Sequence, residues 1–250
     1  MCIRDSKSGD PHTGLDFLGR ALPLATELDN QQEKANILQA TGIAYLSLNR
    51  PDDALHNFQD SLAIKQQIPD KRGEAASLNE IAAIQDSQGK PDAALATYKQ
   101  ALAVRTEIGD QVGIGSSLID TGSFYHDHGK PTEALDYFTR ALQIERQLGD
   151  QSRQALCLNN IGSIKMDQGA YQDSLTYLEQ AYDLRQKLNV PADLGESLHN
   201  LAEVNTKLGQ FDTALADYLK AIETFRGVND QTGVAQESNG MAKIFAAQGR

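Results

Sequence analysis

The side chains capable of catalysis or metal binding are scattered along this 250-residue chain and form no complete motif. His126 and His128 flank Asp127, but residues two apart do not share a face of a helix. His199 and Glu203 stand at i and i+4, which is a ligand spacing. No third ligand is adjacent in the sequence, so a solvated pair is favoured and no metal site is expected.

Cys157 is the one internal thiol, and it directly precedes Leu158 in an apolar stripe. A small buried hydrophobe is a better interpretation than a nucleophile, because no general base is visible. The sequence also lacks the phosphate-binding loop, the dinucleotide fingerprint, the nucleophile elbow and the zinc-protease motif. We therefore expect neither enzymatic activity nor a cofactor.

An internal period of 40 residues organises the whole chain. Turn residues recur at this spacing, with Asn49 in the one slot that lacks glycine; they are Gly9, Asn49, Gly89, Gly129, Gly169, Gly209 and Gly249. Prolines follow two residues later at Pro11, Pro51, Pro91 and Pro131, and a second turn is marked by Asp70, Asp110, Asp150 and Asp230. Glycine ends helices and proline suits their first position, so each repeat holds two helical segments.

Apolar residues between the turns recur with helical spacing, and strand alternation is absent. The first helices of the pairs are predicted at 31–48, 71–88, 111–128, 151–168, 191–208 and 231–248. The second helices are predicted at 11–28, 51–68, 91–108, 131–148, 171–188 and 211–227. A single amphipathic pair cannot cover its own apolar face, so the pairs must stack.

Small residues mark where the helices of a pair should approach each other. One position of the first helix holds Gly42, Ala82, Gly122, Gly162, Ala202 and Ala242. One position of the second helix holds Ala54, Ala94, Ala134, Ser174 and Ala214. The predicted fold is all-α, a right-handed superhelical solenoid of antiparallel helix pairs.

These positions resemble the signature of the tetratricopeptide repeat family. The matching residues in one repeat are Leu118, Gly122, Tyr125, Ala134, Phe138 and Ala141. The period of 40 exceeds the usual 34 of that family. The longer repeat, with Leu-Asn-Asn-Ile-Gly at 158–162, looks like the variant found in kinesin light chains and in adaptors that carry GoLoco motifs.

The resemblance implies that the first helices line a concave face that binds peptides. An asparagine amide offers both a donor and an acceptor to a peptide backbone. Asn160 and Asn200 match the slot of the family's peptide-holding asparagine, whereas Leu156 and Glu196 occupy slots where a carboxylate clamp would need cations. The predicted groove residues are Asn79, Glu80, Asp86, Asp120, Asp127, Asn159, Asn160, Asp167, Glu196, His199, Asn200 and Glu203.

Two alternatives to this ligand-binding role stay open. Asn160 could be buried between pairs and bound to a backbone carbonyl, serving the stack alone. The acidic residues of the predicted groove could be a solvated face and nothing more. In the ligand-binding interpretation, their excess over Lys207 and Lys243 favours a peptide that carries Lys or Arg.

The net charge of -11 argues against binding to nucleic acid or to acidic membranes. No apolar run is long enough to span a membrane, and two cysteines without C-x-x-C spacing favour a reducing, cytoplasmic location. Residues 1–8 are interpreted as a leader or the remnant of a preceding helix, and residues 9–250 as a continuous array of about six helix pairs, truncated at both ends, within a larger polypeptide.

The sequence thus predicts a noncatalytic protein–protein interaction scaffold that binds peptide segments. The alternative is a ligand-sensing module that controls a fused effector domain such as a signalling receptor, a protease or a kinase.

Overall fold

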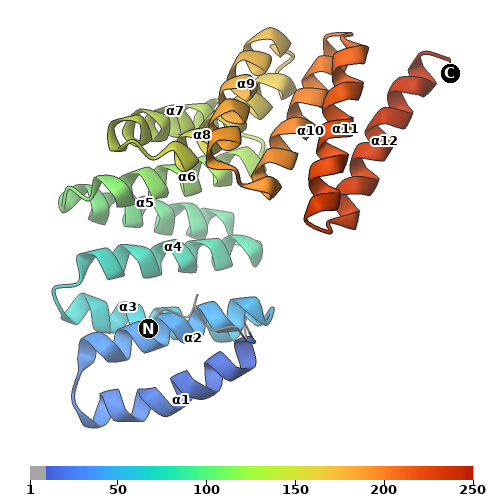
Figure 1. Ribbon diagram of the computed structural model, residues 1–250. Coiled ribbons are helices and arrows are strands. Elements are labelled where there is room, and N and C mark those ends of the chain that lie inside the picture. The colour runs from blue at the N-terminus through green and yellow to red at the C-terminus, as the bar shows by residue number, and fades with distance from the viewer. Residues whose placement is uncertain (1–9, 250) are drawn as a thin grey trace. The chain divides into compact units, whose positions relative to one another are not determined.

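The computed structural model describes residues 10–249, and within that range the chain forms twelve helices and no strand (Figure 1). The helices are α1 (Pro11–Glu27), α2 (Gln31–Ser47), α3 (Pro51–Gln67), α4 (Lys71–Ser87), α5 (Pro91–Glu107), α6 (Gln111–Asp127), α7 (Pro131–Leu148), α8 (Gln151–Asp167), α9 (Tyr171–Leu188), α10 (Pro191–Lys207), α11 (Phe211–Gly227) and α12 (Gln231–Ala247). Each lies within one residue of its predicted bounds. The predicted leader, residues 1–8, falls outside the described residues.

The turns form for the reasons that the sequence indicates. Gly89 and Gly129 adopt positive φ angles of 71° and 66°, and Asn49 takes the same left-handed conformation with a φ of 55°. Asp150 and Asp230 cap the next helix, each accepting a hydrogen bond from the backbone N–H three residues on. The same short connection therefore recurs between most helices.

The turn between α3 and α4 has a different backbone conformation, because it contains a proline. Pro69 occupies the place of the left-handed residues Gly109 and Gly149, but its ring holds φ near -65°. The residue before a proline avoids the helical region, and Ile68 is accordingly extended, with φ -105° and ψ 158°. The chain reaches the Asp70 cap of α4 by a different path.

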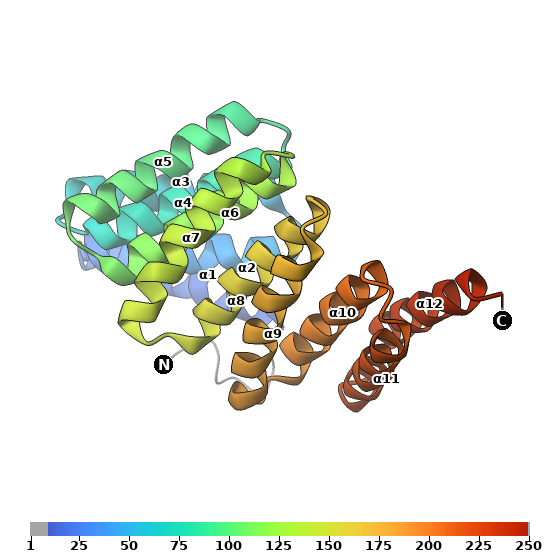
Figure 2. The same cartoon turned by 90° about the horizontal axis from the view of Figure 1, so that it is seen from above.

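The chain divides into two compact units, residues 1–121 and 122–250, and the boundary falls within α6. We call α2, α4, α6, α8, α10 and α12 the first helices, and α1, α3, α5, α7, α9 and α11 the second helices. In unit 1, α2 packs most extensively on α3, and α4 on α5. In unit 2 the same holds for α8 with α9 and for α10 with α11, and Figure 2 shows α10, α11 and α12 side by side.

The predicted small residues lie at the contacts within helix pairs. A Cβ atom added to Gly42 would meet the ring of Phe58 at 2.7 Å, and one added to Gly162 would meet Leu178 at the same distance. Ser174 is fully buried, and its hydroxyl donates to the Gly162 carbonyl oxygen at 2.7 Å. Ala242 differs because it is exposed, which fits its place on α12, where no following second helix is described.

No helix between residues 10 and 249 combines the length and the apolar character that a membrane crossing requires. Cys157 is fully buried, as predicted, and burial raises the pKa of its thiol to about 12. A thiol with such a pKa is not a reactive nucleophile near neutral pH.

Candidate functional site

In unit 1, Asn79 links two first helices. The Asn79 side chain lies on α4, is 9% exposed, and donates from Nδ2 to Oδ2 of Asp120 on α6. Its Oδ1 accepts from the Ser117 hydroxyl at 3.4 Å. Both ends of the amide are therefore engaged by the protein itself.

Glu80 and Asp120 place two half-buried carboxylates on the first helices of unit 1. Burial raises the pKa of Glu80, and the charge of Asp120 raises it further. Burial also raises the pKa of Asp120, against the opposing effects of Arg105 and of the Asn79 hydrogen bond. Glu80 has no hydrogen bond or ion pair within the described residues. Asp86 lies half-buried on the same helix, α4.

In unit 2, Asn159 holds a similar place between α8 and α10. It is 3% exposed, donates to Glu196 Oε1 at 3.0 Å, and accepts from Asn200 Nδ2 at 2.9 Å. The other carboxylate oxygen of Glu196 lies 3.4 Å from Arg185 Nη2. Asn159 thus joins two neighbouring helix pairs through a continuous polar network.

Asn160 shows a different environment from Asn159. Its side chain is half-buried, and its Nδ2 donates to the Leu156 carbonyl oxygen of the same helix at 3.0 Å. Its Oδ1 accepts no hydrogen bond from the described residues. The amide oxygen is therefore open to an external donor.

His199 is oriented by a buried carboxylate. Its Nδ1 lies 3.0 Å from Glu237, which is 1% exposed, and its Nε2 lies 3.8 Å from Glu203 on the same helix. The hydrogen bond to Glu237 raises the pKa of His199, burial lowers it, and the charges of Glu237, Glu203 and Glu196 raise it further. Across residues 10–249 no group of three or more His, Cys, Asp or Glu is arranged to hold a metal ion.

Asp127 and Asp167 are the most exposed acids of the predicted set, with side-chain exposures of 70% and 67%. His126 lies between them, with Nδ1 3.5 Å from Asp127 and Nε2 3.8 Å from Asp167. The structure therefore divides the predicted residues by environment: Asn79 and Asn159 join helix pairs, whereas several carboxylates face solvent or lack partners.

Comparison with family models identifies the repeat. The tetratricopeptide repeat model matches residues 6–67, 57–107 and 113–188, which is more than half of the chain. The chain belongs to the tetratricopeptide repeat (TPR) family. A model described as anaphase-promoting complex subunit 5 also matches, over residues 161–245. No significant match is found among curated proteins.

Several solved structures share the fold. BtubC (BKLC) from P. vanneervenii has a TM-score of 0.79 at 20% identity, covering 88% of this chain and 92% of that one. A putative kinesin light chain with TPR-like repeats from Podosopora anserina gives 0.58 at 19% identity, over 82% and 96%. A Rap protein complexed with competence and sporulation factor gives 0.70 at 15% identity, over 95% and 74%. At these identities the likeness shows the fold alone.

The TPR helix pairs are also joined by buried cations that sequence analysis missed. Arg105 donates to the Ser117 hydroxyl at 2.8 Å and to the Gly113 carbonyl oxygen at 2.6 Å. Arg185 makes the equivalent bond to Ser197 at 2.9 Å. Lys65 occupies the same place one repeat earlier, 3.2 Å from the Ser77 hydroxyl. The spacing of these cations, 40 residues from Lys65 to Arg105 and 80 from Arg105 to Arg185, is the signal that could have revealed them.

The contact between α7 and α8 reverses this charge. Glu145 takes the position of the cation, is fully buried, and lies 3.4 Å from Arg153 Nη1. Burial raises the pKa of Glu145, while Arg153 lowers it. Its Oε2 has no hydrogen-bond partner in the described part of the chain. The contact between α7 and α8 therefore buries an acid where the contacts of the neighbouring repeats bury a cation.

Proposed function

We propose that this TPR chain is a noncatalytic scaffold whose first helices bind peptide segments that carry Lys or Arg. The observation that carries the proposal is the pair Glu80 and Asp120, two half-buried carboxylates of raised pKa, one of which lacks a partner in the described residues. Keeping like charges close together opposes stability, and a bound cation relieves that repulsion.

The first helices of unit 2 support the same proposal with a more exposed set. Asp127 and Asp167 offer carboxylates to solvent, and Asn160 offers a free amide oxygen to a peptide N–H. The buried amides of Asn79 and Asn159 hold the helices that carry these groups. In this proposal the negative charge of the carboxylates selects basic peptides and raises their rate of association. The Asn160 amide positions the peptide backbone.

Charge-neutral variants test the proposal in each unit separately. Glu80→Gln with Asp120→Asn alters unit 1, and Asp127→Asn with Asp167→Asn alters unit 2. The matched control removes two exposed acids from second helices, by Asp92→Asn with Glu133→Gln. The ligand is a labelled lysine-rich peptide, and fluorescence anisotropy measures its dissociation constant.

We expect at least one site variant to bind about three- to tenfold more weakly, because each exposed pair contributes up to ~1 kcal/mol. The control should bind normally, and affinity should fall as salt rises. Equal losses in control and site variants would show that net charge alone attracts the peptide. Equal binding of a glutamate-rich peptide would also overturn the proposal.

A further inference from the structure

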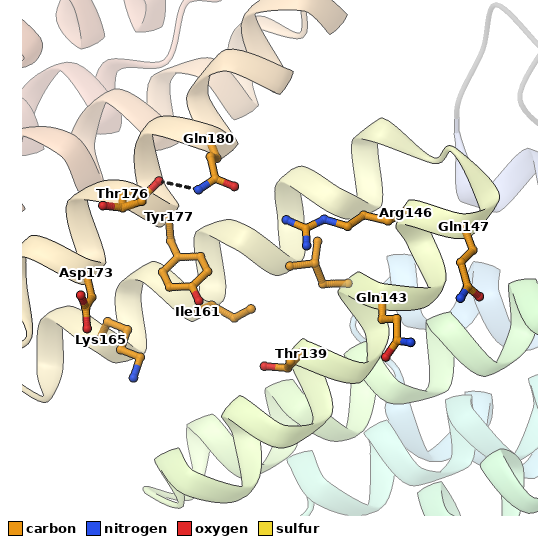
Figure 3. Close-up of a pocket in the computed structure, with 11 residues that line it drawn as sticks. Thr139, Gln143, Arg146, Gln147, Ile161, Lys165, Asp173, Thr176, Tyr177 and Gln180 are labelled. Atoms are coloured by element: carbon orange, nitrogen blue, oxygen red, sulfur yellow. Dashed lines mark hydrogen bonds between the residues drawn. The ribbon is translucent and has the colours of Figure 1, made fainter.

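A cleft of about 860 Å³ lies on the second helices of unit 2. Its walls come from α7 and α9, and residues of α8 form its floor (Figure 3). The volume falls within the ~300–1,000 Å³ range of ligand pockets. Leu142, Ile161 and the ring of Tyr177 give it an apolar lining. None of the residues proposed above to bind basic peptides lines it.

Two cations face this cleft without partners. Arg146 comes from α7 and Lys165 from α8 (Figure 3). Neither side chain makes a hydrogen bond or ion pair with the described residues. Asp173 also lines the cleft, so its charged side chains sum to a net positive charge on a chain whose total is -11.

The combination of Arg146 and Lys165 is found in this cleft and in no other repeat. Positions one repeat apart can be compared directly because the period is 40 residues. The positions equivalent to Arg146 and Lys165 in the other repeats hold Thr26 and Tyr45, Gln66 and Gln85, Thr106 and Tyr125, Gln186 and Asn205, and Arg226 and Phe245. Arg226 is the one other cation among these five pairs, and no pair contains two, so stacking of the repeat does not require both cations.

We propose that this cleft binds an acidic peptide segment. Arg146 and Lys165 would pair with side-chain carboxylates, and the apolar lining would cover the stems of the same residues. The lining runs along α7 from Thr139 to Gln147, about 12 Å at 1.5 Å per residue. An extended segment of about four residues spans that length, whereas an isolated anion would engage only the two cations.

The polar groups along the walls suit a peptide backbone. The amide of Gln143 on α7 has no partner in the described residues, and the Oε1 of Gln180 on α9 is likewise free, since that side chain bonds through Nε2 to the Thr176 carbonyl oxygen. Amides on both walls can pair with successive backbone N–H and C=O groups. The same cleft thus contains cations that can bind carboxylates and amides that can bind a peptide backbone.

The test uses a double variant, Arg146→Gln combined with Lys165→Gln, which has the same residues as positions 66 and 85. A control double variant changes the net charge by the same amount. The control is Lys187→Gln with Lys207→Gln, two exposed lysines of unit 2 that do not line the cleft. The probes are a labelled peptide with four consecutive glutamates, its glutamine counterpart, and inorganic phosphate as competitor. Anisotropy measures binding, and thermal melting confirms that each variant is folded.

We expect the cleft variant to bind the glutamate peptide about tenfold more weakly and the control to change by less than about twofold. The variant Glu80→Gln with Asp120→Asn should bind it normally, which separates this site from the proposed site for basic peptides. Three results would overturn the proposal: equal losses in cleft variant and control, equal affinity for the glutamine peptide, or full displacement of the glutamate peptide by millimolar phosphate.

Discussion

Replacing Gly162 with alanine is expected to destabilise unit 2 even though alanine favours helices. The new Cβ would lie 2.7 Å from both Cγ and Cδ2 of Leu178 and 3.4 Å from its backbone nitrogen. Leu178 is fully buried, so its side chain has little space to move away. Overpacking of this kind costs about 1–3 kcal/mol, against a helix-propensity gain of at most ~1 kcal/mol. With the full propensity gain, the expected net loss is up to about 2 kcal/mol.

A double-mutant cycle isolates the contact. Leu178→Ala alone should cost about 2–5 kcal/mol, because it leaves a cavity. In that background the Cβ at position 162 meets no leucine side chain, so Gly162→Ala should become neutral or favourable, with a coupling energy of about 1–3 kcal/mol. Gly227→Ala is the control, since a Cβ there has no neighbour within 4 Å.

The assay is urea denaturation of the four proteins of the cycle and of the control, analysed at a common m-value. A stabilised Gly162→Ala protein would show that the helices separate at no cost. Additive losses in the cycle would show that Leu178 is not what excludes the methyl group. Either result refutes the argument that glycine is needed for close approach of α8 and α9.

Two further predictions concern pH and local stability. The pKa of His199 is raised in the fold, chiefly by Glu237, so its stabilisation is complete below the unfolded pKa of about 6.5 and is lost as pH rises through the folded pKa. The melting temperature of unit 2 should therefore fall between about pH 6 and pH 8, and His199→Gln should remove that slope; an unchanged slope in the variant would assign it to another group. Helix α1 contains Pro23 and buries only Ala25, whereas α5 buries four residues. Amide exchange should open α1 before α5, and equal protection would contradict this.

The helices could be predicted closely because one turn chemistry repeats. Gly129 followed by Pro131 both ends one helix and begins the next, so a single well-understood connection fixes many boundaries. Pro69 shows the limit, because the period indicated a turn there but not its altered path. Local residue chemistry therefore accounts for most of the secondary structure.

The candidate site was harder to predict because it depends on how neighbouring repeats are rotated. Asn159 contacts Glu196 and Asn200, which are 37 and 41 residues away. A strict spacing of 40 indicates none of these partners. The cleft cations Arg146 and Lys165 belong to different helices, so they stand out only when equivalent positions of several repeats are compared.

The reversed charge at Glu145 makes the order of the repeats matter. Deleting residues 71–110 would bring Lys65 against Gly113 and Ser117, the same residue types as its present neighbours Gly73 and Ser77. Deleting residues 151–190 would instead place Glu145 beside Asp193, one buried acid against another acid. Deletion of residues 71–110 should thus leave the fold intact, whereas deletion of residues 151–190 should destabilise it. The charge buried between neighbouring helix pairs therefore determines which repeats can be deleted without placing like charges together.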